Sequence, residues 1–119
     1  MSMDRIPILR VRGIIIVSLQ IDLSDSLVYQ FQEDLLSSIE ANPAKGVVID
    51  VSSVRILDTF TSRALAQTAQ MAMLMNTPTV ISGMSPSIVL TLIEMGFAGT
   101  NGFRTTLDLD SAIALLDEP

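Results

Sequence analysis

Residues 46–60 read GVVIDVSSVRILDTF, and this stretch decides the fold. Val47 to Val51 form a short run that is apolar on both faces, as expected for a strand covered by helices on both sides of a sheet. A polar loop from Ser52 to Leu57 follows. Asp58 can then cap a helix, because its carboxylate accepts a hydrogen bond from a free amide of the first turn. The stretch therefore predicts a central strand, a connecting loop and the start of a helix.

The segment before this stretch predicts a β-hairpin. Ile6 to Val11 alternate between apolar and polar positions, and Ile14 to Leu19 form an apolar run rich in β-branched residues. Arg12-Gly13 supply a short turn between the two. The hairpin must be antiparallel, because two residues cannot connect parallel strands.

Helices and short strands alternate along the rest of the chain. The predicted elements are a helix capped by Ser24 or Asp25 and ending before Asn42, a helix from Asp58 to about Met75, a strand at 79–82, a helix from Ser85-Pro86 to Met95, a strand at 103–106 and a helix from Asp108 or Asp110 to Leu116. This alternation indicates an α/β domain whose mixed sheet is mainly parallel and joined by right-handed crossovers. We expect one domain over residues 1–119, with an N-terminal hairpin and about four helices, and Met71, Met75 and Met95 as gap fillers in its core.

The composition excludes several classes of chemistry. The chain has no cysteine and no histidine, so it has no disulfide, no thiolate or imidazole metal ligand, and no Cys or His nucleophile or base. Neither glycine-rich phosphate-binding pattern, G-x-G-x-x-G or G-x-x-x-x-G-K-[ST], occurs in it. We therefore expect no cofactor, no metal, no catalytic residues and no enzymatic activity.

Charge and hydropathy point toward protein partners. The net charge of -6 disfavours nucleic acid, and we expect Arg5, Arg10, Arg12 and Arg55 to be solvated surface charges. No signal peptide or membrane-length apolar run is present, which predicts a cytoplasmic protein that does not enter the membrane. Apolar residues nevertheless make up 49% of the chain. Part of the surface is therefore expected to be covered by another protein or by self-association.

Two acidic residues near the central strand allow different interpretations. Asp50 and Asp58 could form a carboxylate pair for acid–base chemistry or for Mg²⁺, although no partner Lys, Arg or His lies nearby in the sequence. Asp58-Thr59 could equally be a routine helix cap, since Asp, Ser and Thr are common at helix starts. Composition alone does not separate these interpretations from a functional hydroxyl at Thr59.

A resemblance favours the functional hydroxyl. Residues 47–53, VVIDVSS, followed by residues 56–59, ILDT, resemble the signature of STAS domains, the anti-sigma-factor antagonist family. The predicted order of elements fits that family along nearly the whole chain. In the family, the hydroxyl residue after the aspartate is phosphorylated, so the resemblance implies that Thr59 is the phosphorylation site.

Three further segments resemble the stressosome scaffold branch of the family, the RsbS type: residues 6–9 (IPIL), 31–36 (FQEDLL) and 91–96 (TLIEMG). Ordinary antagonists usually carry Ser-Ser-Gly after the aspartate, whereas this chain has Thr-Phe-Thr at residues 59–61. Scaffolds of this branch normally carry serine at the position of Thr59. Thr91 is similar to a second modified threonine of the related RsbR scaffold domains.

The resemblance also implies a set of partners. They are an RsbT-type serine/threonine kinase, RsbR-type co-scaffolds, an RsbX-type phosphatase and further copies of the chain, with phosphorylation releasing the kinase in a general stress response. Asp58, Phe60, Ser62 and Arg63 are the expected partner-binding residues beside the phosphorylation site. The alternative is a conventional antagonist that binds an anti-sigma kinase in a small complex.

Overall fold

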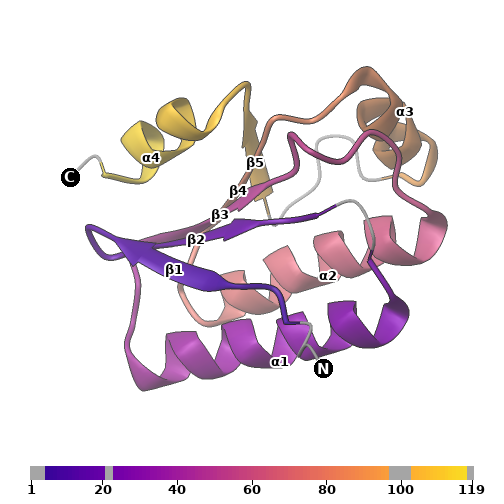
Figure 1. Cartoon of the computed structure of the whole chain (residues 1–119). Coiled ribbons are helices and arrows are strands. Elements are labelled where there is room, and N and C mark those ends of the chain that lie inside the picture. The colour runs from indigo at the N-terminus through magenta and orange to yellow at the C-terminus, as the bar shows by residue number, and fades with distance from the viewer. Residues whose placement is uncertain (1–4, 21–22, 97–102, 118–119) are drawn as a thin grey trace.

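The computed structural model describes residues 5–20, 23–96 and 103–117, which form a five-stranded sheet with four helices (Figure 1). The elements are β1 (Ile8–Val11), β2 (Ile14–Ser18), α1 (Asp25–Ala41), β3 (Gly46–Asp50), α2 (Thr59–Leu74), β4 (Thr79–Ser82), α3 (Pro86–Glu94), β5 (Phe103–Thr106) and α4 (Leu109–Asp117). The spatial order of the strands is β1-β2-β3-β4-β5, and only the β1–β2 pair is antiparallel. The predicted α/β class, hairpin and mainly parallel sheet are thus confirmed.

The hairpin turns on two residues with left-handed backbone. Arg12 has φ 56° and Gly13 has φ 79°, and Val11 pairs directly with Ile14. Positive φ at both central residues is typical of the tight turn whose twist matches that of antiparallel strands. The turn therefore fixes the register that places β2 beside the central strand β3.

Strand β3 lies at the centre of the sheet and contributes to two apolar cores. Val47 and Ile49 belong to the larger core together with residues of α1, α2 and α3, whereas Val48 belongs to a smaller core that includes Ala112 of α4. Figure 1 shows α1 and α2 along one face of the sheet and α4 over the other. The strand is apolar on both faces because both faces are covered.

Helix α2 packs closely because its buried side is made of small residues. Its four alanines at positions 64, 66, 69 and 72 are all buried. The prediction that Met71, Met75 and Met95 fill gaps in the core was wrong: Met75 is 37% exposed, and Met71 in α2 and Met95 at the end of α3 are only half-buried and belong to neither core. Close approach of the small residues leaves no gap for a long side chain to fill.

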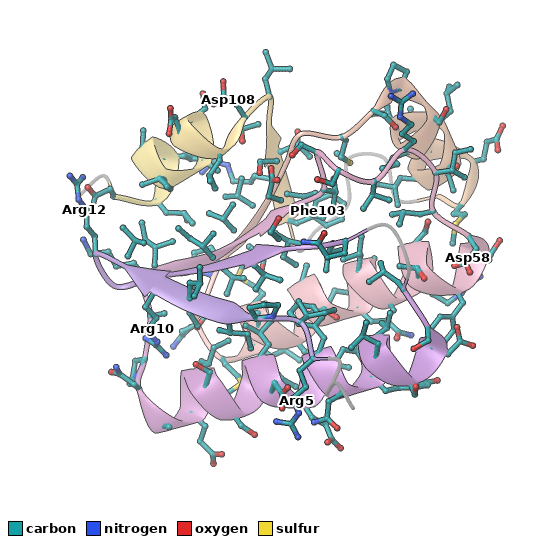
Figure 2. The ribbon with its side chains drawn as sticks, in the orientation of Figure 1. Arg5, Arg10, Arg12, Asp58, Phe103 and Asp108 are labelled. Atoms are coloured by element: carbon teal, nitrogen blue, oxygen red, sulfur yellow. The ribbon has the colours of Figure 1, made fainter. Side chains whose placement is uncertain are left out.

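Of the arginines predicted to be solvated, Arg5, Arg12 and Arg55 are exposed, whereas Arg10 is half-buried and held by α1. Arg10 extends toward the C-terminal end of α1 (Figure 2), where its guanidinium donates to the carbonyl oxygens of Ser38 at 2.8 Å and Asn42 at 2.6 Å. Arg5 and Arg12 form exposed ion pairs with Asp34 and Asp117, at 3.6 and 3.2 Å. Arg10 therefore satisfies helix-terminal carbonyls and places a positive charge at the negative end of the α1 dipole.

The C-terminal end of helix α4 packs where strand β3 begins. A Cβ on Gly46 would lie 2.6 Å from Cδ2 of Leu116 and 3.0 Å from the Pro78 carbonyl oxygen, so a larger residue would require the Leu116 side chain to move. Asp117 accepts a hydrogen bond from Lys45 Nζ at 2.8 Å, and that bond is the main reason why the pKa of the Asp117 carboxyl is lowered. The opposite edge of the sheet, where the strands end, carries the candidate site.

Candidate functional site

The loop that follows β3 starts in a fixed position. The Asp50 carboxylate accepts hydrogen bonds from the hydroxyls of Ser52 at 2.6 Å and Ser82 at 2.8 Å, and the Val51 amide donates to the Ser82 carbonyl at 2.9 Å. Gly83, with φ 77°, lies so close that a Cβ there would be 2.8 Å from Cβ of Ser52. The carboxylate of Asp50 thus joins the end of β3, the start of the loop and the end of β4.

The loop is held further by apolar anchors. Val51, Val54 and Leu57 are buried, and all three belong to the larger core. Arg55 is exposed and Ile56 is 75% exposed, so the chain between the last two anchors presents its side chains to solvent. The loop is therefore a surface feature on a buried base.

Thr59 lies at the point where this loop becomes helix α2. Asp58 is the N-cap, with φ -76° and ψ 172°, and its carboxylate accepts a hydrogen bond from the Thr61 amide at 2.7 Å. Thr59 is the first helical residue and is exposed. Figure 2 shows Asp58 at the N-terminal end of α2, at the surface of the molecule. The structure thus places a hydroxyl at a helix N-terminus, where backbone amides lack intrahelical partners and the dipole favours negative charge.

The other residues predicted around Thr59 differ in how far they reach the surface. Phe60 is half-buried and meets the exposed Tyr29 of α1 edge-on, with ring centroids 5.4 Å apart and an interplanar angle of 69°. Arg63 is exposed, one turn beyond Thr59. Ser62 is 0% exposed, and therefore does not lie on this surface with Asp58, Phe60 and Arg63. Its place on the inward side of α2 follows from the helical period rather than from its distance in sequence to Thr59.

Thr91 lies within α3, in a different element from Thr59. Its hydroxyl donates to the Ser87 carbonyl one turn earlier at 2.9 Å, and the residue is half-buried. This is a common bond of a threonine within a helix. Thr91 is therefore less available than Thr59, whose side chain is exposed.

Asp50 and Asp58 each bind local hydrogen-bond donors. Asp50 is engaged by two serine hydroxyls and Asp58 by the first turn of α2. Within residues 5–20, 23–96 and 103–117, no group of three or more acidic, histidine or cysteine residues could hold a metal ion, and no helix is long and apolar enough to cross a membrane. Both carboxylates act here as local structural acceptors.

One feature that the sequence interpretation missed is an exposed apolar face on α3. Val89, Leu90 and Ile93 are 38%, 60% and 51% exposed, while Ile88 and Leu92 on the other side of the helix are buried. The signal was available, because a helix that is apolar on all sides must expose part of that surface or have it covered. Ser85, the N-cap of α3, binds the Arg55 carbonyl of the Thr59 loop, so this face belongs to the same region of the molecule.

The family model of the STAS domain matches residues 5–112. The chain belongs to the STAS domain family. This STAS domain is similar in structure to a serine-to-glutamate variant of RsbS from Moorella thermoacetica, at 35% sequence identity, with a TM-score of 0.82 and 93% of each chain covered. It is also similar to a chain in a structure of the stressosome, described as a signal integration and transduction hub. The two are 34% identical with a TM-score of 0.78, and the match covers 92% of this chain and 95% of the other.

More distant relatives share the fold of this STAS domain. The anti-sigma factor antagonist SpoIIAA in its unphosphorylated form aligns at 12% identity with a TM-score of 0.75, covering 93% of this chain and 95% of SpoIIAA. Its phosphorylated form aligns with a TM-score of 0.70. No curated protein sequence matches the chain significantly.

Proposed function

We propose that this STAS domain is a stressosome scaffold subunit of the RsbS type, which binds an RsbT-type kinase and releases it when Thr59 is phosphorylated. The observation that carries the proposal is the exposed hydroxyl of Thr59 at the start of α2, in a chain 35% identical to RsbS over 93% of both lengths. The kinase transfers the γ-phosphoryl group of ATP to the Thr59 oxygen. ADP leaves, and the hydroxyl proton passes to a base of the kinase.

The position of Thr59 supports modification of the folded protein. The hydroxyl lies at the surface, after a loop whose buried anchors Val54 and Leu57 stay in the core. A phosphate there adds about 1.5 to 2 negative charges next to free amides at the positive end of α2. Arg63, four residues later and exposed, is placed to pair with it. The fold is therefore expected to survive phosphorylation.

The consequence for a partner is electrostatic. Asp58 is exposed beside Thr59, so the phosphate creates a concentrated negative patch on a chain whose net charge is already -6. Acidic groups of a docked kinase would then be repelled. Each tenfold weakening requires only about 1.4 kcal/mol, so a single phosphate is enough to switch an interface of moderate affinity.

The exposed apolar residues supply surface for the other proposed partners. Ile56 flanks the acceptor, and Val89, Leu90 and Ile93 lie on α3. Exposed large apolar side chains of this kind are typical of protein interfaces. In this proposal, RsbR-type co-scaffolds and further copies of this chain bind these surfaces in the assembled complex. An RsbX-type phosphatase removes the phosphate from Thr59.

The modification is tested by incubating the protein with an RsbT-type kinase and Mg-ATP, with and without an RsbR-type scaffold. Intact-mass and peptide mass spectrometry should locate one phosphate on Thr59, and Thr59→Ala should abolish it. Thr59→Ser is the matched control, since it keeps the hydroxyl and restores the residue usual in RsbS-type proteins. If neither the wild-type chain nor Thr59→Ser is phosphorylated, the proposal is contradicted.

The release step requires a binding measurement. Thr59→Glu should bind the kinase more weakly than Thr59→Ala, although a carboxylate carries less charge than a phosphate. Equal affinities would count against release by charge. Size-exclusion chromatography separates the scaffold from the alternative role: a scaffold forms a very large complex with RsbR-type proteins, whereas a conventional antagonist forms only a small complex with an anti-sigma kinase.

A further inference from the structure

One serine hydroxyl connects helix α3 to residues 52–57, which we call the acceptor loop because it leads into Thr59. Ser85 Oγ accepts a hydrogen bond from the Ile88 amide at 3.3 Å, as the N-cap of α3, and donates to the Arg55 carbonyl at 2.7 Å. A hydroxyl has one donor and two acceptor positions, so both bonds form at the same time. Two segments 30 residues apart in sequence thus meet at one oxygen atom.

The bond to Arg55 lies where the loop is otherwise least constrained. Val54 and Leu57 are buried, but Arg55 and Ile56 between them are exposed. The Val54 amide donates to the nearby Val51 carbonyl at 2.9 Å, and within the described part of the chain the Ser85 bond is the one hydrogen bond that joins residues 55–57 to a segment distant in sequence. It acts four residues before Thr59, on the segment that leads directly into the Asp58 cap.

We propose that Ser85 is a positioning residue for phosphoryl transfer to Thr59, and that its bond to the Arg55 carbonyl holds residues 55–57 in the conformation that the kinase docks on. The inference rests on the proposed function. A loop that is already ordered loses little conformational entropy on docking, whereas a loosened loop must be ordered by the kinase. Loss of the bond should therefore weaken docking more than it slows chemistry.

Three substitutions separate the bond to the loop from the cap of α3. Ser85→Asp keeps an excellent N-cap acceptor for the Ile88 amide but has no proton to donate to the Arg55 carbonyl. Ser85→Gly also lacks the donor, weakens the cap only slightly because glycine is itself a favourable N-cap residue, and adds no charge. Ser85→Thr keeps the hydroxyl and is the conservative control. Agreement between the Asp and Gly variants excludes an effect of charge alone.

The first readout is made on the isolated protein. Backbone ¹⁵N order parameters of residues 55–57 should fall from the rigid range of about 0.85 toward the flexible range below about 0.6 in Ser85→Asp and Ser85→Gly. Those of α2 should stay unchanged, and Ser85→Thr should match the wild type. Circular dichroism should confirm that α3 is retained.

The second readout is steady-state phosphorylation of Thr59 by the RsbT-type kinase. In the Asp and Gly variants, KM for the scaffold should rise about threefold to tenfold, the effect of one ordinary hydrogen bond, while kcat stays within about twofold. Ser85→Thr should restore the wild-type KM. A merely structural role of the α3 cap would leave this KM unchanged as long as the cap is kept.

The possible outcomes can be told apart. Unchanged order parameters in both donor-free variants would overturn the inference whatever the kinase does. A looser loop with an unchanged KM would overturn the positioning role. Absence of transfer to Thr59 in the wild-type chain would instead refute the proposed function, and this inference with it.

Discussion

Replacement of Gly83 by alanine tests how tightly the acceptor loop is packed against β4. Gly83 and Gly96 both have left-handed backbone, with φ of 77° and 83°. Among the described residues, a Cβ on Gly96 would meet nothing within 4 Å, whereas one on Gly83 would lie 2.8 Å from Cβ and 3.1 Å from Cα of Ser52. Gly96→Ala is therefore a matched control that carries the backbone cost without the crowding.

The magnitude follows from these contacts. A Cβ in the left-handed region costs the folded state about 1–2 kcal/mol. This cost is partly offset by about 0.4–1 kcal/mol, because alanine lowers the conformational entropy of the unfolded chain. We expect Gly96→Ala to lower the free energy of unfolding by roughly 1 kcal/mol. Gly83→Ala adds overpacking of about 1–3 kcal/mol, because the backbone of Ser52 cannot rotate away as a side chain would. Its total is therefore about 2–4 kcal/mol.

Urea unfolding monitored by circular dichroism measures both variants under the same conditions. The double variant Gly83→Ala/Ser52→Gly removes the nearest atom, and should be less destabilised than the sum of the single variants by about 1 kcal/mol or more. Equal destabilisation by Gly83→Ala and Gly96→Ala would refute the reasoning, since a Cβ on Gly83 is crowded by Ser52 and by Asp50 Oδ1 at 3.2 Å, and one on Gly96 is not crowded by any described residue.

Three further predictions concern contacts elsewhere in the domain. The pKa of Asp117 is lowered chiefly by the hydrogen bond from Lys45, so the ionised carboxylate stabilises the fold at pH 7. Asp117→Asn should therefore be less stable than the wild type at pH 7, and the difference should disappear as pH falls below the usual carboxyl range. Urea unfolding of both proteins across pH checks this. In a double-mutant cycle, Phe60→Leu and Tyr29→Leu should show a coupling of about 0.5–1.5 kcal/mol, measured as free energies of unfolding. Arg10→Gln should lower the free energy of unfolding by about 1–2 kcal/mol in thermal melts, with partial recovery in Arg10→Lys, because the helix-terminal carbonyls of α1 lose a charged donor.

The elements were predictable where their limits depend on neighbouring residues. Helices α2 and α3 begin at Asp58 and Ser85-Pro86 as predicted, since a cap acts on amides only two or three residues away. Strand β5 has its predicted bounds, Phe103–Thr106. The remaining differences are of one or two residues, such as β3 ending at Asp50 rather than Val51. Local pattern was sufficient because the sheet joins strands in chain order.

The contacts that hold the candidate site together were not predictable from local pattern. The Ser85 bond to Arg55 spans 30 residues and the Ser82 bond to Asp50 spans 32. Both pairs meet only because parallel strands end at the same edge of the sheet. The burial of Ser62 was likewise missed, although the period of α2 could have revealed it. Proximity in sequence to Thr59 is a poor guide to which side chains share its surface.

The first turn of a helix is a position where phosphorylation can act on partners without altering the fold. In the proposed modification, a phosphate on Thr59 gains from the dipole and free amides of α2 but loses from its proximity to the Asp58 carboxylate, so the two effects on stability oppose each other. A partner experiences no such compensation, because the dipole acts within the first turn while the added charge projects outward. A hydroxyl buried within α2 would have to unfold the helix to be modified, as Ser62 would. Thr59 thus combines an exposed hydroxyl with a position where modification changes only the surface, as the proposed role of a reversible docking platform requires.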